Sequence, residues 1–108
     1  MTITADTTEI AAQFDALAHP VRLRLLHLIA KHGDTLHVDA LTRKIGTLTQ
    51  ATITFHLQQM YRAGILTRTK HGLYVYYHLR PEGLSDMQNE LDRLLWQHTQ
   101  AAAEARRV

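Results

Sequence analysis

With 108 residues the chain is long enough for one compact domain and too short for two. Its 45% hydrophobic content is typical of a globular protein, its net charge of +2 is unremarkable, and the absence of cysteine excludes disulfides, thiolate metal sites and redox thiols. No apolar run approaches the roughly 18 residues that cross a bilayer, and the first residues lack the pattern of a signal peptide. We therefore expect a cytosolic protein with a single domain over residues 1–108.

The distribution of charge is more informative than its sum. All acidic residues lie before residue 40 or after residue 81, and the segment 40–81 carries only cations, namely Arg43, Lys44, Arg62, Arg68, Lys70 and Arg80. Such a segment attracts a polyanion. The same charges could also form a solvated face, so the local folding pattern has to decide between the two.

Two helices are predicted before residue 35. Residues Asp6–Glu9 (DTTE) have the form of a capping box, so the first helix should begin near Thr7. Pro20 suits the first turn of the second helix because its missing N–H would have no partner there. The apolar stripes are Ile10, Phe14, Leu17 and Ala18 in the first helix and Val21, Leu25, Leu26, Leu28 and Ile29 in the second. Arg22 and Arg24 are expected to stay in solvent.

The acid-free segment predicts a helix-turn-helix over residues 37–64 and a wing over residues 65–80. A short helix from Val38 ends at Gly46, and a second helix, which Thr49 can cap, closes at residues 63–64. Two helices joined by a short glycine-containing turn form the helix-turn-helix unit. The following runs LTRTK and LYVYYHL, rich in Thr, Tyr and Val, predict a β-hairpin with its turn at His71–Gly72.

A long last helix is predicted over residues 83–105. Its apolar stripe comprises Leu84, Met87, Leu91, Leu94, Leu95, His98 and Ala102. Because such a stripe must be buried on the same domain or on a second subunit, we expect this helix to pair with the first helix across the two-fold axis of a homodimer. The predicted fold is mainly α (α+β), a winged helix-turn-helix in the order α-α-α-α-β-β-α.

Helical periodicity divides the second helix of the motif into two sides. With Ile53, Leu57 and Met60 buried, the side chains that point away at 100° per residue are Ala51, Phe55, Gln58 and Arg62, flanked by Gln50 and Thr54. Gln and Thr can hydrogen-bond to bases, Ala and Phe can contact a thymine methyl, and cations can hold phosphates. The predicted DNA-binding residues are Thr49, Gln50, Ala51, Thr52, Thr54, Phe55, Gln58, Arg62, Arg68, Lys70 and His71.

Some side chains near this face have a second, structural interpretation. An exposed Phe55 indicates a contact surface, but its ring could instead pack under the wing. His56, about 60° from the centre of the buried stripe, is interpreted as a partly buried structural histidine. The wing tyrosines are predicted to pack within the hairpin rather than to stack on bases, namely Tyr74, Tyr76 and Tyr77.

Four short motifs occur along the chain, namely Ala16–Leu26 (ALAHPVRLRLL), Leu48–Leu57 (LTQATITFHL), Ala63–Leu66 (AGIL) and Gly72–Leu79 (GLYVYYHL). In this order and spacing they make the chain resemble the ArsR/SmtB winged-helix repressors over nearly its whole length. The resemblance implies a dimeric repressor that leaves its operator when an inducer binds, with base contacts from Gln50, Ala51, Thr54 and Phe55. Because the family usually carries a histidine where this chain has Phe55, the resemblance also implies a different operator preference.

The sensor sites of the family have no full counterpart here. Many members carry a Cys-x-Cys pair where this chain has His37 and Asp39, which suit zinc or another borderline metal but not thiolate-type arsenic, antimony or cadmium sites. A second family site uses Asp, His, His and Glu, of which the last helix offers Asp86 and His98, and His98 could instead pack at the dimer interface. A zinc or nickel sensor is therefore an alternative. DNA binding is expected to need no cofactor, and the inducer is unassigned.

Two other classes of function fit the sequence less well. An enzyme would need a nucleophile with its base, convergent acids or a Gly-rich phosphate loop, and the sequence offers none of these patterns. A winged-helix module that binds a protein partner through Phe55 is the other alternative, but the basic, acid-free segment favours duplex DNA. The sequence thus predicts a dimeric, sequence-specific DNA-binding transcription repressor.

Overall fold

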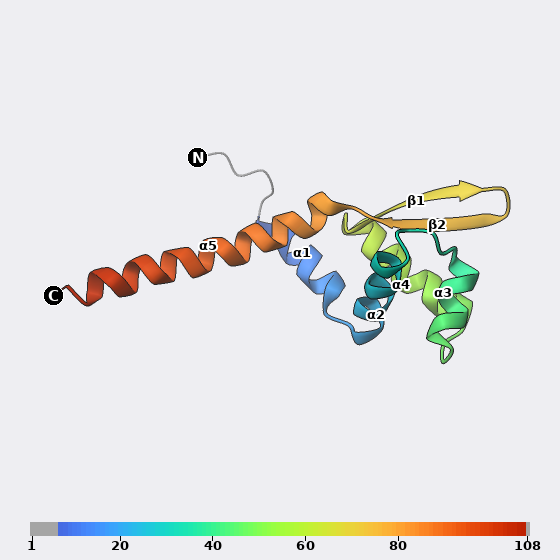
Figure 1. The fold of residues 1–108 in the computed structure, drawn as a ribbon, viewed down its shortest axis with the longest axis horizontal. Helices are drawn as coiled ribbons and strands as arrows, with labels where there is room; N and C mark the ends of the chain where they lie inside the picture. The colour runs from blue at the N-terminus through green and yellow to red at the C-terminus, as the bar shows by residue number, and fades with distance from the viewer. Residues whose placement is uncertain (1–6, 108) are drawn as a thin grey trace.

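The computed structural model of the protein describes residues 7–107. Its elements are α1 (Thr7–Leu17), α2 (Pro20–Lys31), α3 (Val38–Ile45), α4 (Gln50–Arg62), β1 (Leu66–His71), β2 (Tyr74–Leu79) and α5 (Pro81–Ala105). The predicted order α-α-α-α-β-β-α and the winged helix-turn-helix fold are confirmed. Figure 1 shows α2, α3 and α4 packed together beside the hairpin, while α5 runs past α1 and projects from the opposite end.

The ends of the helices follow from local backbone chemistry. Pro20 occupies the first turn of α2, as expected. The His37 side chain caps α3, which ends at Gly46 in the left-handed conformation at φ 76°. The Thr49 hydroxyl caps α4 by accepting the N–H of Thr52 at 3.2 Å. These caps fix where the two helices of the helix-turn-helix begin.

The apolar stripe predicted for α1 is partly wrong. The helix begins at Thr7 as expected, whereas Asp6 of the predicted capping box lies outside the described residues. Ala18 is exposed because it follows the last residue of the helix, where the chain turns towards α2. Gln13 and Ala16 are buried instead. Ile10, Phe14 and Leu17 do face the core as predicted, so the stripe is wrong only at Ala18 and extends to Gln13 and Ala16.

The core is formed by α1 to α4, the hairpin and the start of α5, and its buried apolar residues are Ile10, Ala16, Leu25, Ile29, Val38, Leu41, Ile45, Ile53, Leu57, Met60, Ile65, Leu66, Tyr77 and Met87. The prediction that Arg22 stays in solvent is wrong, since only 6% of this residue is exposed. Arg22 lies three residues before Leu25 and seven before Ile29, so it shares their face of α2 and points inward. Arg24, on the other side, is exposed as predicted.

The wing is a two-stranded antiparallel hairpin in which His71 pairs with Tyr74. Its turn therefore lies at Gly72 and Leu73, one residue beyond the predicted His71–Gly72. The shift has a conformational cause, because Gly72 has a φ of 62° and supplies the left-handed residue at the first central position of a two-residue turn. At the base of the hairpin, the N–H of Leu79 donates to the carboxylate of Asp34 at 3.1 Å. The wing is thus tied to the α2–α3 loop.

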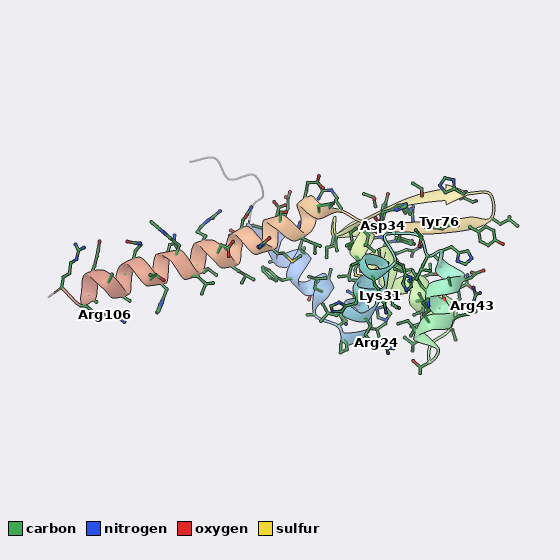
Figure 2. The ribbon with its side chains drawn as sticks, in the orientation of Figure 1. Arg24, Lys31, Asp34, Arg43, Tyr76 and Arg106 are labelled. Carbon is green, nitrogen blue, oxygen red and sulfur yellow. The ribbon has the colours of Figure 1, made fainter. Side chains whose placement is uncertain are left out.

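Helix α5 begins at Pro81, two residues before the predicted start, because proline is tolerated in the first helical turn. Its first turns bury Gly83 and Met87. Farther along, Leu91, Leu94 and Leu95 are 50%, 54% and 67% exposed. Figure 2 shows the side chains of this part standing free of the rest of the chain, out to Arg106.

The projecting helix makes the subunit elongated. Its radius of gyration is 17.5 Å, whereas about 13 Å is expected for a compact domain of this length. One chain alone therefore leaves most of the α5 stripe in contact with water.

Among the described residues no helix combines the length and the apolar content needed to span a membrane.

The close approach of α5 to the α4–β1 turn yields a first prediction. A Cβ atom at position 83 would overlap the carbonyl oxygen of Gly64, which is backbone and cannot swing away. We expect Gly83→Ala to lower the free energy of unfolding by about 2 kcal/mol, measured by urea unfolding followed by circular dichroism. The exposed Ser85→Ala is the matched control and should change it by less than about 0.5 kcal/mol. Equal stability of the two variants would contradict this packing.

Candidate nucleic-acid interface

Helix α4 has the two sides that its sequence predicted. Ile53, Leu57 and Met60 are fully buried. The residues predicted on the outer side and its first turn are exposed or partly exposed, namely Thr49, Gln50, Ala51, Thr52, Thr54, Phe55, Gln58 and Arg62. The outer side is thus a row of hydroxyl, amide, apolar and guanidinium groups.

A groove of about 500 Å³ separates this side of α4 from the wing. Three sets of residues line it, namely Gln50, Thr54 and Gln58 from α4, His37, Val38 and Asp39 from the start of α3, and Arg68, Thr69, Lys70, Leu73, Tyr74, Val75 and Tyr77 from the hairpin. Five of the predicted DNA-binding residues therefore meet at one concave surface, whereas the other six lie outside its lining. A single carboxylate, that of Asp39, belongs to this lining.

Arg68 is held in place by two aromatic side chains. Its guanidinium carbon lies 4.3 Å from the centroid of the Tyr61 ring, a cation–π contact. The interaction with the Tyr77 side chain raises the pKa of Arg68 above its ordinary value. Sequence reasoning missed Tyr61, because no local pattern relates the C-terminal half of α4 to β1. The two tyrosines direct a fixed cation along the groove.

The tip of the wing carries further exposed groups. Lys70 and His71 are exposed, and Leu73 in the turn is 93% exposed. The His71 ring meets Tyr76 edge-on at 5.6 Å between centroids. An apolar side chain so fully exposed near Lys70 is typical of a contact surface rather than of a solvated turn. The sequence analysis assigned no role to Leu73.

Phe55 does not pack under the wing. Its side chain is absent from the lining of the groove, and the residue is 52% exposed. Its ring contacts the neighbouring His56 edge-on, with 5.7 Å between centroids. Of the two interpretations of Phe55, packing under the wing is wrong, and a contact role for the exposed ring stays a prediction. His56 is half-buried, as predicted.

His37 has a structural role at the rim of the groove. Its Nδ1 atom accepts the N–H of Ala40 at 3.2 Å, and its ring lies 4.7 Å from that of Tyr74 and 5.9 Å from that of Tyr76. Tyr77 is buried and Tyr76 half-buried, in agreement with packing inside the hairpin. Tyr74 differs, because it is half exposed and lines the groove.

The four residues predicted as candidate metal ligands do not assemble within one chain. The capping bond engages Nδ1 of His37, which leaves only its other ring nitrogen for a metal ion. Asp86 and His98 lie twelve residues apart on α5, which corresponds to about 18 Å along a helix. Within residues 7–107 no three His, Asp or Glu side chains cluster closely enough to hold a metal ion. A zinc or nickel site does not fit these residues in a single subunit.

The fold and the groove together define a class of protein. A helix-turn-helix whose second helix exposes a polar row, beside a basic hairpin, is the architecture of a winged-helix DNA-binding regulator. In agreement, residues 17–69 match the family model described as "Helix-turn-helix domain".

Two curated relatives name the family more closely. The chain is 31% identical over 78 residues to the "Arsenical resistance operon repressor" of Bacillus subtilis, a match that covers 72% of each chain. It is 44% identical over 69 residues to the "Arsenic resistance transcriptional regulator ArsR1" of Pseudomonas putida, covering 64% of this chain and 52% of the relative. The match thus spans about half the length of the Pseudomonas protein.

A solved structure gives the same fold. It is the homodimeric winged helix-turn-helix DNA-binding domain of Mb0332 from Mycobacterium bovis, described as a possible ArsR-family regulator, with a TM-score of 0.61 and 23% identity over 96% of this chain and 92% of that one. From these comparisons the chain belongs to the ArsR family of winged-helix transcriptional regulators. This family consists of regulators and not of enzymes, as the sequence predicted.

The capping role of His37 yields a second prediction. His37→Ala removes the side chain that accepts the N–H of Ala40 and should lower the free energy of unfolding by about 1 kcal/mol. His37→Asn should restore most of it, because asparagine is a preferred N-cap. Urea unfolding with and without zinc measures both. A zinc-dependent stabilisation of the wild type that both variants lose would instead identify His37 as a metal ligand.

Proposed function

We propose that the protein is a homodimeric, sequence-specific DNA-binding repressor of transcription that acts in the cytoplasm. Its single domain over residues 1–108 divides into the helix-turn-helix, the wing and the dimerisation helix, at residues 37–64, 65–80 and 81–105. One observation carries the proposal, namely that the outer side of α4 and the cations of the wing line the same groove. Both belong to the segment without acidic residues.

In this proposal α4 reads bases in the major groove. Gln50 and Gln58 supply amides and Thr54 a hydroxyl, all on the side that lines the groove. Ala51 and Phe55 lie on the exposed side next to them, where apolar groups can contact the methyl of thymine. The exposed ring of Phe55 gives this surface an apolar patch at its centre.

The remaining predicted residues would hold the DNA backbone. Arg62 at the end of α4 and Arg68 and Lys70 on the wing are exposed cations that can neutralise phosphates, and His71 lies beside them. Thr49 and Thr52, whose hydroxyl oxygens are 3.0 Å apart, mark the first turn of α4, where phosphates are commonly bound. These contacts set the affinity and the register, while α4 sets the sequence.

The partner of α5 is proposed to be a second copy of the chain. The stripe of Leu91, Leu94 and Leu95 is exposed in one subunit, and α5 packs against α1 where it leaves the body. The related domain from Mycobacterium bovis is described as homodimeric. A dimer would bury the stripe and place two α4 helices for two half-sites of a palindromic operator.

The signal that releases the operator is proposed to use groups other than thiolates. The curated relatives are named for arsenic resistance, but the 108 residues contain no cysteine from which to build a thiolate arsenic site. A zinc or nickel site involving His37, Asp39, Asp86 or His98 would need ligands from two subunits.

A duplex carrying the DNA upstream of the protein's own gene tests the proposal. Affinity for it should exceed affinity for random duplex and fall about 10³-fold between about 50 and 200 mM salt, because six or more neutralised phosphates release counterions. Fluorescence anisotropy measures both affinities. Binding that ignores salt, or no preference for the upstream duplex, would contradict the proposal.

Single substitutions, measured in the same binding experiment, distinguish contacts with bases from contacts with the DNA backbone. Gln50→Ala and Phe55→Ala should cost about 1–3 kcal/mol on the operator and little on random DNA, whereas Lys70→Ala should weaken both equally. Lys31→Ala removes an exposed cation in the last turn of α2, outside the predicted DNA-binding residues, and is the matched control. Equal losses for all four variants would overturn the assignment of the DNA-binding side.

The dimer yields its own prediction. Replacing Leu91 and Leu95 together by Glu should give a folded monomer, because both side chains are exposed in one subunit, and should lower operator affinity by about 10²-fold through loss of bivalency. Analytical ultracentrifugation gives the mass, and fluorescence of the single Trp96 reports the environment of α5. Asn89→Glu, on the opposite side of α5, is the control. A double variant that stays dimeric would place the interface elsewhere.

A further inference from the structure

Within residues 7–107 the side chain of Arg22 is a cation that lies in the interior. Arg22 in the first turn of α2 is 6% exposed, and its guanidinium connects two other helices. Its Nη1 donates to the carbonyl oxygen of Ala16, near the end of α1, at 3.2 Å. Its Nε donates to Nδ1 of His56, in the middle of α4, at 3.1 Å. Arg22 is thus the side chain through which α1 and α2 hold the recognition helix by polar bonds.

Neither hydrogen-bonded partner of Arg22 is an acid. Within the described part of the chain the recorded ion pair between side chains joins Arg93 and Glu90. Asp15 and Arg62 line a small surface pocket together with Arg22, and neither pairs with it. Burying a cation is unfavourable unless hydrogen bonds replace its hydration. The acceptor on His56 is therefore one of two that offset the burial of Arg22.

This arrangement requires a neutral His56. Because Nδ1 accepts the bond from Arg22, the proton of the neutral ring lies on Nε2. The charged or titratable groups that face His56 are Arg22 of α2 and His19 at the N-cap of α2, whose ring centroid lies 6.2 Å away. Burial, Arg22 and His19 together lower the pKa of His56 below its ordinary value of 6.5.

The position of His56 on α4 lets its hydrogen bond with Arg22 influence how the DNA-binding side of the helix is oriented. On α4 it is flanked by the buried Leu57 and the exposed Phe55, so it lies at the boundary between the two sides of the helix. Packing of the apolar stripe alone resists rotation of the helix about its own axis only in part. A hydrogen bond at the boundary adds to that resistance. Rotation would move Thr54 and Gln58, which line the groove, relative to the wing.

We propose that Arg22 is a positioning residue for the recognition helix, which holds α4 in its DNA-reading orientation through neutral His56 and releases it when His56 is protonated. This inference rests on the proposed DNA-binding function. It makes operator recognition sensitive to acid through one identified hydrogen bond.

The direction of the pH effect follows from the pKa of His56. Because it is lowered in the folded protein, the stabilising contribution of the neutral ring is complete above pH 6.5, the ordinary value, and is lost as the pH falls through the folded-state pKa.

The test measures the ratio of operator affinity to random-duplex affinity between about pH 7.5 and pH 5. In the wild type this ratio should fall with acid, towards about tenfold per pH unit for each subunit, the limit for one coupled proton. In His56→Asn the ratio should stay flat, because the amide oxygen can accept from Arg22 and does not titrate. Arg22→Lys should have a low ratio at every pH, since a single ammonium lacks the planar fork that reaches two acceptors. His27→Asn, exposed on α2, should behave as the wild type.

Three results separate the outcomes. No operator preference of the wild type at pH 7.5 would overturn the proposed function. A clear preference that does not change with acid, or that falls equally in His56→Asn, would overturn the role of Arg22 and His56 alone. If either variant fails to fold, ¹⁵N NMR titration of the wild-type imidazoles decides, and a protonated Nδ1 of His56 at pH 7.5 would overturn the inference.

Discussion

Burial of one side of α4 is the constraint on which the rest of the structure depends. Ile53, Leu57 and Met60 are fully enclosed by α1, α2, α3 and the start of the hairpin. Because a helix turns 100° per residue, enclosing these side chains directs the remaining ones outward. Leu66 and Tyr77 are buried on the same core, so the wing is fixed relative to α4. The groove between them follows from the way the core is packed.

Hydrogen bonds and an aromatic contact then orient the wing and α3, which the core has already placed beside α4. Asp34 ties β2 to the α2–α3 loop, and His37 caps α3 at the rim of the groove. Arg68 gains a fixed direction from Tyr61 and Tyr77. A solvated arginine explores many rotamers, whereas a stacked and bonded one meets a phosphate with less loss of entropy. The proposed phosphate contact of Arg68 is therefore preorganised by its aromatic neighbour Tyr61.

Helix α5 also carries an apolar stripe, but most of that stripe is exposed in a single subunit. Its first turns pack closely, since Gly83 meets the backbone at Gly64, and the leucines of its later turns are exposed among residues 7–107. An apolar stripe of this kind is stable in water only if something covers it. Trp96 is exposed on another side of the helix, so α5 carries more apolar surface than the leucine stripe contains. The proposed dimer covers the stripe and links it to the number of DNA-binding sites.

The sequence by itself determined the elements and the two sides of α4, because caps, glycine stops and 3.6-residue periodicity act between residues a few positions apart. The charge pattern and the four short motifs could also be recognised in the sequence, and they indicated the correct family. The turn of the wing was misplaced by one residue, since either side of Gly72 fits the local pattern. Arg22 could have been placed inside from its spacing to Leu25 and Ile29, but its charge argued for solvent.

Only the tertiary structure decided which side chains meet. Arg22 and His56 are 34 positions apart, Asp34 and Leu79 are 45 apart, and Tyr61 reaches Arg68 from a different element. No periodicity links such pairs, because their proximity arises from the packing of whole helices against one another. The same holds for the candidate metal ligands, which stand at positions that the resemblance assigns to sensor sites but do not converge among the described residues. What covers α5 depends on association, which lies beyond the fold of a single subunit.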